Sequence, residues 1–405
     1  MKIAMINNQL LALLVTISLL AVGGCENYTH SESNDEPESV EQSESNNDFE
    51  TRTLSSQYEE VTLERISGPF DHPWSIAFLS DDRMLITERS GQLNVIKNGN
   101  KTVVTGTPEV NVAGQGGLLE VLPHHDYENS DWIYLTYSKS NGENETATAL
   151  IRGRLSEDNE FIDPEELFVQ NRYSSPGRHY GSKLAWHNDG TLLMSVGDRG
   201  SDPPRAQDTG DHAGTLLRLN DDGTVPDDNP FLNDPDVANE IYSYGHRNIQ
   251  GLVVDPETGK IWSTEHGPRG GDELNYHQPG ENYGWPTVTL GRDYGTEGPF
   301  PDAEARSMEG MVDPVYEFLP THAPSGLVFV TSEQFPAWEG NLLAGGLSSE
   351  RIRRLVLYEG EVIHDEELIL GEIGRIRDIR QGPDGNIYVI NDSDEGYLYR
   401  LTPAD

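Results

Sequence analysis

Six copies of one pattern recur between residues 74 and 392, and this repetition constrains the fold more than any other feature of the chain. Each copy has an extended apolar segment, a turn that contains Asp, Gly or Asn, and a second extended segment that ends near Thr, Ser or Gly. Alternating apolar residues on both sides of a turn are typical of β-hairpins. The copies span residues 74–89, 117–138, 183–198, 251–266, 326–346 and 378–392.

The repetition predicts an all-β fold, a six-bladed β-propeller of four-stranded antiparallel blades. One hairpin cannot bury both of its faces, so repeated hairpins pack on one another around an axis. The 41 Gly and 24 Pro residues suit the many tight turns of such a fold. Two β-sandwiches would fit the composition but not the repetition. Loops at one end of a propeller channel converge, and the longest insertions fall between the third and fifth copies, where we expect function to reside.

The N-terminus predicts export and lipid anchoring. Residues 1–24 have a charged start and an apolar run of signal-peptide length, and they end in a lipobox-like segment before Cys25, the single cysteine of the chain. An ordinary signal peptide followed by a chance cysteine is the alternative. Residues 25–58 are acidic and rich in Ser and Asn, which predicts a disordered tether before a propeller domain at 59–405. We expect a periplasmic or cell-surface protein whose membrane contact is the lipid on Cys25.

The charge of the chain excludes some partners. Asp and Glu number 69 against 28 Lys and Arg, a formal net charge of −41. A field of this sign repels nucleic acid, so no nucleic-acid partner is expected. The acidity is interpreted either as a device for solubility or as adaptation to salt, where screening relieves the repulsion between carboxylates.

Two segments before the second and third copies carry candidate site residues. Gln115 lies among glycines at 114–117, where a backbone can approach a ligand closely, although a plain turn has the same composition. His179 lies on a Gly-flanked loop, and Asp198 ends the hairpin that follows it. A carboxylate beside an imidazole holds its tautomer and stabilises its protonated form, which suits a general base. A purely structural histidine remains the alternative.

Three further segments offer binding groups. Arg247 and Asn248, in the segment 244–248, would suit a carboxylated or quinonoid ligand, or a surface ion pair. Residues 265–273 gather acidic side chains on a Gly/Pro-bent loop, which admits a hard cation such as Ca²⁺ but lacks the spacing of an EF-hand. Arg375 and Arg377 lie on the same side of one extended strand and could hold a polyanion if they face the channel.

Taken in order, these segments resemble the soluble PQQ-dependent aldose sugar dehydrogenases of the glucose/sorbosone dehydrogenase family. PQQ is the quinone cofactor pyrroloquinoline quinone. The resemblance covers about residues 60–403, and its specificity lies in the whole set of motifs rather than in one. These are His72-Pro73-Trp74, Gly114-Gln115-Gly116-Gly117, Tyr244-Gly245-His246-Arg247-Asn248, Glu265-His266-Gly267-Pro268, Gly271-Asp272-Glu273 and Asn282-Tyr283-Gly284-Trp285.

The resemblance implies a catalytic and cofactor-binding set. His179 resembles the base that takes the proton of the anomeric hydroxyl, and Asp198 looks like its carboxylate partner. Arg247 matches a position near the cofactor carbonyl that gains negative charge. The implied contacts to PQQ are Gln115, Arg247, Asn248, Tyr294, Arg375 and Arg377.

The resemblance also implies calcium. The backbone carbonyls of Gly267 and Pro268 look like ligands of a Ca²⁺ that bridges protein and PQQ, where it would act as a Lewis acid. Glu273 and the Tyr283 carbonyl resemble ligands of a second, structural Ca²⁺. The chain departs from some relatives at Ser348, which stands where they have a lysine that anchors a PQQ carboxylate.

The predicted function is therefore the oxidation of an aldose to a lactone with PQQ and Ca²⁺, by a monomer or homodimer that passes electrons to an acceptor the sequence does not identify. Two alternatives stay open. A lipid-anchored propeller could bind carbohydrate or protein without turnover, because propellers host many functions. A calcium-dependent lactonase would use the same fold but would have no need for Arg375 and Arg377.

Overall fold

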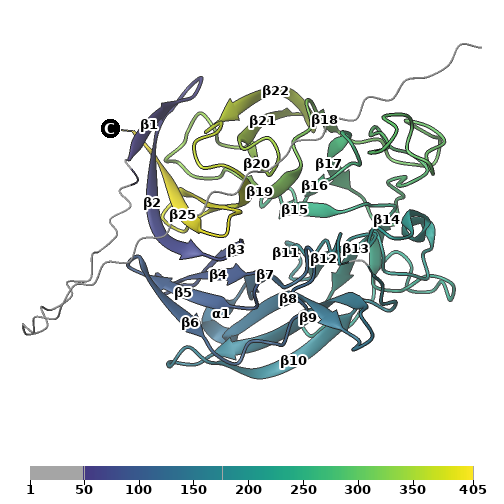
Figure 1. The fold of residues 1–405 in the computed structure, drawn as a ribbon, viewed down its shortest axis with the longest axis horizontal. Helices are drawn as coiled ribbons and strands as arrows, with labels where there is room; N and C mark the ends of the chain where they lie inside the picture. Colours follow the sequence, from purple (N-terminus) through teal and green to yellow (C-terminus); the bar gives the residue numbers. More distant parts are fainter. Residues whose placement is uncertain (1–48, 50, 176, 405) are drawn as a thin grey trace, which may run out of the picture. The chain divides into compact units, whose positions relative to one another are not determined.

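The computed structural model describes residues 49, 51–175 and 177–404, and these residues form six antiparallel sheets arranged in a ring (Figure 1). Each hairpin predicted from the repeat is the first pair of strands of one blade, as the six pairings β3–β4, β7–β8, β11–β12, β15–β16, β19–β20 and β23–β24 show. The predicted six-bladed propeller is confirmed.

Blades one to five are continuous in sequence and contain four strands each. Blade one has β3 (Pro73–Phe78), β4 (Met84–Glu88), β5 (Leu93–Lys97) and β6 (Asn100–Val104). Blade two has β7 (Leu118–Pro123), β8 (Trp132–Ser140), β9 (Thr146–Leu155) and β10 (Phe161–Val169). Blade three has β11 (Leu184–Trp186), β12 (Leu192–Val196), β13 (Thr215–Leu219) and β14 (Ile241–Tyr244).

Blade four has β15 (Ile249–Val254), β16 (Ile261–Glu265), β17 (Asp272–His277) and β18 (Tyr316–Phe318). Blade five has β19 (Pro324–Phe329), β20 (Leu342–Gly346), β21 (Ile352–Tyr358) and β22 (Glu361–Leu368). The helical elements of the described residues are one turn of helix, α1 (Tyr127–Ser130), and a 3₁₀ turn at Pro203–Gln207. The described part of the chain has no helix with the length and apolarity needed to cross a bilayer.

The sixth blade closes the ring with strands from both ends of the domain. It combines β23 (Ile376–Gln381), β24 (Ile387–Asn391) and β25 (Gly396–Pro403) with β2 (Glu60–Phe70), in which Leu63 lies opposite Leu401. A fifth strand, β1 (Arg52–Ser55), pairs with β2, so residues 52–55 form a strand inside the range 25–58 predicted as a disordered tether. The physical reason is Leu54, which packs against the core between the fifth and sixth blades. Residues 1–48, with the predicted signal peptide and Cys25, lie outside the described residues.

The hydrophobic core is divided into six main clusters, one between each pair of neighbouring blades. Successive residues of one strand therefore serve different clusters. Leu85 of β4 packs toward blade two and Ile86 toward blade six. Because both faces of a blade are buried, its second strand is apolar at consecutive positions rather than strictly alternating.

A buried ionic cluster joins the blades where their first strands meet. Its buried members are Glu120 of β7, Lys183 just before β11 and Asp378 of β23, and Arg380 of β23 is partly buried. Lys183 Nζ lies 2.9 Å from Glu120 Oε2 and 3.0 Å from Asp378 Oδ1. Arg380 contacts both carboxylates. Each charge is buried at a cost of several kcal/mol unless it is paired, so the cluster ties blades two, three and six together.

We expect Lys183→Met to lower the free energy of unfolding by about 3–5 kcal/mol, because the substitution leaves two buried carboxylates with one cationic partner. Urea denaturation of the variant and the wild type measures this difference. Lys97→Met changes the same residue type at an exposed position and should shift the free energy by less than about 0.5 kcal/mol. Equal small effects of both substitutions would contradict a structural role for the cluster.

Candidate active site

Four of the predicted site residues line a cavity of about 590 Å³ at one end of the ring: Gln115, Asn248, Arg375 and Arg377. His179 is not in the lining, but its neighbours Tyr180 and Gly181 are. The cavity lining comes from the starts of the first strands and the ends of the second strands, so all six blades contribute. Trp74 of β3 forms part of the wall, and the Nζ atom of Lys183 lies 4.6 Å from the centroid of its ring. The ionic cluster therefore lies directly behind the cavity wall. The lining residues are His72, Trp74, Arg89, Gln115, Leu119, Tyr180, Gly181, Asn248, Gln250, His266, Ala323, Leu347, Arg375, Arg377, Asp392, Ser393 and Asp394.

His179 and Asp198 form the pair predicted from the sequence. His179 Nδ1 lies 2.6 Å from Asp198 Oδ1, with the Asp198 side chain buried and that of His179 12% exposed. The backbone of His179 has a φ of +50°, an uncommon conformation for a residue with a side chain. With Nδ1–H donated to Asp198, the neutral ring carries its lone pair on Nε2, the atom that could accept a proton.

Burial lowers the pKa of His179 and outweighs the opposing effect of the Asp198 carboxylate; Arg247 and Arg178 add to the lowering. The pKa of Asp198 is also lowered. Its burial alone would raise that pKa, but His179, Arg247 and Trp285 together favour the carboxylate anion. At neutral pH the pair is therefore a neutral imidazole hydrogen-bonded to a carboxylate, the state required of a general base.

Trp285 is a member of this site to which the sequence assigned no role. Its indole Nε1 donates a 2.8 Å hydrogen bond to Asp198 Oδ2. The residue lies in the segment 282–285 that supports the family resemblance, but nothing in the local pattern indicates that it meets a residue 87 positions earlier. The packing of the β17–β18 connection of blade four against the end of β12 in blade three, rather than local sequence, creates this contact.

Gln115 and Asn248 position the loop that carries His179. Gln115 Oε1 accepts a 2.8 Å hydrogen bond from the backbone N–H of His179, and Asn248 Oδ1 accepts one of 3.0 Å from that of Gly181. Both side chains also line the cavity. Arg247 lies beside the cavity rather than in its lining, with Nη1 donating to the His266 carbonyl at 3.1 Å and its guanidinium 5.4 Å from the centroid of the Trp285 ring.

Arginines make this part of an acidic protein cationic. Arg375 and Arg377 line the cavity as predicted, and both contact Asp392 Oδ2, at 3.0 and 3.1 Å. Arg89 also lines it, and sequence analysis missed this residue because an arginine after a strand carries no distinctive signal. The Nε atoms of Arg89 and Arg377 are buried without a hydrogen-bond partner among the described residues. With Asp392 and Asp394 also in the lining, the three arginines leave an excess of one positive charge that could attract an anionic ligand.

The residues predicted to hold cations surround a second, much smaller cavity of about 10 Å³, roughly the space of one monatomic ion or water. Gly267, Glu273 and Tyr283 line it, together with Glu265; Pro268 does not. Burial and the neighbouring Glu265 raise the pKa of Glu273 well above its ordinary value. The Glu265 and Glu273 carboxyl groups could hold a cation in this space, which the Arg247 guanidinium also lines.

Backbone oxygens must supply the remaining ligands of such an ion. In the part of the chain that the structure describes, no three His, Cys, Asp or Glu side chains gather as a metal site. The carbonyl oxygens of Gly270 and Gly271 approach Gly267 so closely that a Cβ at Gly267 would collide with both. This crowding of carbonyls fits a hard cation better than a transition metal.

Tyr294 does not join the other predicted residues. It is 62% exposed and does not line the large cavity. It lies beside the turn at 293–298, where the Asp293 carboxylate accepts hydrogen bonds from the backbone N–H groups of Gly295 and Thr296. The local turn determines the course of this loop, and it leaves the tyrosine in solvent.

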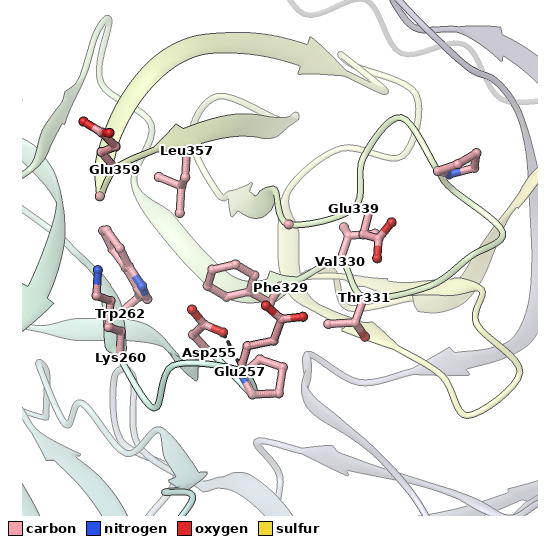
Figure 2. Close-up of a pocket in the computed structure, with 14 residues that line it drawn as sticks. Asp255, Glu257, Lys260, Trp262, Phe329, Val330, Thr331, Glu339, Leu357 and Glu359 are labelled. Atoms are coloured by element: carbon pink, nitrogen blue, oxygen red, sulfur yellow. Dashed lines mark hydrogen bonds between the residues drawn. The ribbon is translucent and has the colours of Figure 1, made fainter.

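A groove of about 580 Å³ lies at the opposite end of the fourth and fifth blades (Figure 2). Its walls come from the turns between β15 and β16, between β19 and β20 and between β21 and β22. They include Trp262 and Phe329 together with the acidic residues Asp255, Glu257 and Glu359. None of the predicted site residues line it. The volume of a cavity alone therefore does not identify the candidate active site; the convergence of the dyad, the arginines and the amides does.

Comparison with known proteins places this arrangement among sugar dehydrogenases. The sequence profile of the family described as Glucose / Sorbosone dehydrogenase matches residues 70–400. An aldose sugar dehydrogenase of Escherichia coli is 38% identical over 349 residues, which cover 85% of this chain and 94% of the relative.

Solved structures agree with the sequence match. The crystal structure of the soluble aldose sugar dehydrogenase of Escherichia coli in its apo-form has a TM-score of 0.82 at 38% identity, covering 85% of this chain and 100% of that one. The PQQ-bound form of aldose sugar dehydrogenase from Streptomyces coelicolor has a TM-score of 0.69 at 25% identity, covering 84% and 98%.

We expect Asp198→Asn to lower the pKa of His179 further, because a neutral amide cannot stabilise the imidazolium as the carboxylate does. The measurement is an NMR titration of the His179 ring in the wild type and the variant. In the wild type the midpoint should lie below the ordinary value for histidine. A midpoint that rises in the variant would show that Asp198 does not stabilise the charged ring.

Proposed function

The chain belongs to the glucose/sorbosone dehydrogenase family, and we propose that it oxidises aldose sugars to lactones with PQQ and calcium, using His179 as the general base. Family membership supports a sugar dehydrogenase; the cofactor, the cation and the base are our assignments. The observation that carries them is the cavity itself. It brings the His179 loop, three arginines and the side-chain amides of Gln115 and Asn248 to one end of the propeller.

The large cavity suits PQQ, a planar quinone with three carboxylates. Arg89, Arg375 and Arg377 offer guanidinium groups, and two of the three have a buried Nε that lacks a partner among the described residues. Charge-assisted hydrogen bonds from arginine are the usual means of holding carboxylates in a fixed orientation. The PQQ-bound neighbour from Streptomyces coelicolor supports the same assignment.

The small cavity suits Ca²⁺. Glu273 and Glu265 would supply carboxylate oxygens, and the loop 267–271 together with Tyr283 would supply carbonyl oxygens. When bound in these cavities, PQQ would supply a hydride acceptor for the anomeric C–H bond and Ca²⁺ a Lewis acid.

The protein's own groups account for the proton. In its neutral form, His179 would accept the proton of the anomeric hydroxyl at Nε2 as the C–H bond is broken. Asp198, held ionised, would stabilise the imidazolium that forms and keep the ring in one tautomer. Gln115 would fix the loop through its hydrogen bond to the His179 N–H, so that Nε2 stays in place. Arg247 would lie close enough to the reacting centre to stabilise developing negative charge.

The proposal is tested by titrating metal-stripped full-length protein with PQQ, in calcium and in chelator, while following the absorbance of the cofactor and aldose-dependent dye reduction. We expect calcium-dependent uptake followed by turnover. Uptake with no turnover across a panel of aldoses would contradict the assignment of His179, and a lack of uptake would contradict the assignment of PQQ and leave a binding propeller.

Arg377→Gln is expected to weaken PQQ binding about 10- to 100-fold, because it removes a charge-assisted hydrogen bond of roughly 1.5–3 kcal/mol. Fluorescence or absorbance titration gives the dissociation constants. Arg83→Gln removes an arginine that is bound to Asp81 at the opposite end of blade one, and it should leave the affinity unchanged. Similar affinities in wild type and Arg377→Gln would exclude Arg377 as a PQQ contact.

His179→Gln should lower kcat by about 10²- to 10⁴-fold while PQQ affinity stays within a few fold, because the base acts in the chemical step. In the wild type, kcat/KM should fall as the pH drops through the lowered pKa of His179, so that activity persists below the ordinary pKa of histidine. Steady-state rates across pH for both proteins make this measurement. An unchanged pH profile in the variant would assign the base elsewhere.

A further inference from the structure

The buried Trp285 indole makes a specific hydrogen bond to the carboxylate that pairs with His179. The residue is 5% exposed, and its Nε1–H donates to Asp198 Oδ2 at 2.8 Å. The other oxygen, Oδ1, faces His179 Nδ1 at 2.6 Å and accepts the backbone N–H of Gly200 at 2.8 Å. The carboxylate that orients the base is therefore anchored at both oxygens, and the tryptophan holds the one that His179 does not.

Trp285 is restrained through its backbone and through its ring. Its backbone N–H donates to the Gly245 carbonyl at 2.9 Å, and its backbone carbonyl accepts a 2.7 Å hydrogen bond from Gln207 Nε2. The centroids of the Trp285 and Phe300 rings are 4.7 Å apart, and the Arg247 guanidinium lies 5.4 Å from the centroid of the Trp285 ring. A donor restrained in this way loses little conformational freedom when it makes its hydrogen bond, so little entropy opposes the hydrogen bond to Asp198.

We propose that Trp285 is a positioning residue that fixes Asp198 through its indole N–H and, through Asp198, limits the basicity of His179. Each N–H that binds the carboxylate withdraws part of its negative charge. Because the Trp285 and Gly200 N–H groups both bind Asp198, its carboxylate is a weaker partner for the His179 imidazolium than it would be without the indole. The neutral, proton-accepting form of His179 is thereby favoured near neutral pH.

The charged groups around the pair do not change when the indole is removed. His179 is faced by Asp198, Arg178, Arg247 and His266. Asp198 is faced in addition by Arg199 and Glu265. A substitution at Trp285 that conserves an aromatic ring therefore alters the hydrogen bond to Asp198 without adding or removing a charge.

Trp285→Phe removes the N–H and keeps a ring against Phe300. A matched control is Trp262→Phe at the far groove (Figure 2), because Trp262 is 2% exposed and its Nε1 has no hydrogen-bond partner among the described residues. Both variants shorten a buried indole to a phenyl ring, but only the first breaks a hydrogen bond. Circular dichroism and thermal unfolding establish that each variant is folded.

The decisive measurement is the NMR titration of the His179 ring in full-length protein without added cofactor. We expect the pKa of His179 to rise by about half a unit or more in Trp285→Phe, because a hydrogen bond to a charged group is lost. It should stay at the wild-type value in Trp262→Phe. An unchanged or lowered pKa in Trp285→Phe, or an equal rise in both variants, would overturn the proposal.

A second measurement on the wild type guards against a variant that does not fold. With the six tryptophans labelled at the indole nitrogen, the Trp285 N–H resonance should move with the titration of His179, and that movement should be reduced in Asp198→Asn. A Trp285 resonance that ignores the titration would also overturn the proposal.

The consequence for turnover rests on the proposed function. In the PQQ-loaded enzyme, the acid limb of kcat/KM should move to higher pH in Trp285→Phe by the shift seen in the titration, and kcat at its plateau should fall roughly tenfold as Asp198 loses its anchor. A wild type that shows no turnover would count against the proposed function alone, since the titrations still decide the role of Trp285. An acid limb that stays in place despite a raised pKa of His179 would exclude His179 as the base.

Discussion

The structure depends on how six blades satisfy the polar groups that meet where their first strands converge. In a propeller the first strands of successive blades are neighbours around the central axis. Polar groups buried between them need partners from other blades. For blades two, three and six, these groups form the ion pairs among Lys183, Glu120, Asp378 and Arg380. Since each charge is costly to bury alone, the cluster forms only when the blades take their correct places. The cluster therefore favours the correct arrangement of these blades as well as joining them.

The same cluster connects the scaffold to the site. Lys183 lies against the ring of Trp74, which forms part of the cavity wall on the other side. The cavity is thus built on a rigid, charge-balanced base, and its own lining is richer in arginine than the acidic surface of the protein. The arginines would give an anionic ligand a locally positive potential here, although the net charge of the whole protein is negative.

Within the site, function depends on hydrogen bonds between loops of different blades. The His179 loop precedes blade three, and the side chain of Gln115 that fixes it comes from the loop before blade two. Trp285, which anchors Asp198, lies on the long connection between β17 and β18 of blade four. A base held by three blades is restrained more firmly than one on a single loop, which accounts for a histidine in an otherwise uncommon backbone conformation.

The sequence alone was sufficient for the architecture, and it supplied candidate residues for the site whose roles stay predictions. A hairpin leaves a period and a turn signal in its own residues, so all six hairpins could be predicted. The His179–Asp198 pair, with Arg375 just before β23 and Arg377 within it, could be proposed as site residues from their places beside these hairpins. Ring closure by β2, the place of Arg89, the exposure of Tyr294 and the bond from Trp285 to Asp198 could not be predicted. These features depend on which distant segments meet, and a contact across 87 residues leaves no local pattern. The local sequence determined which hairpins and which candidate groups the chain contains, and the packing of the blades decided which of these groups face one another.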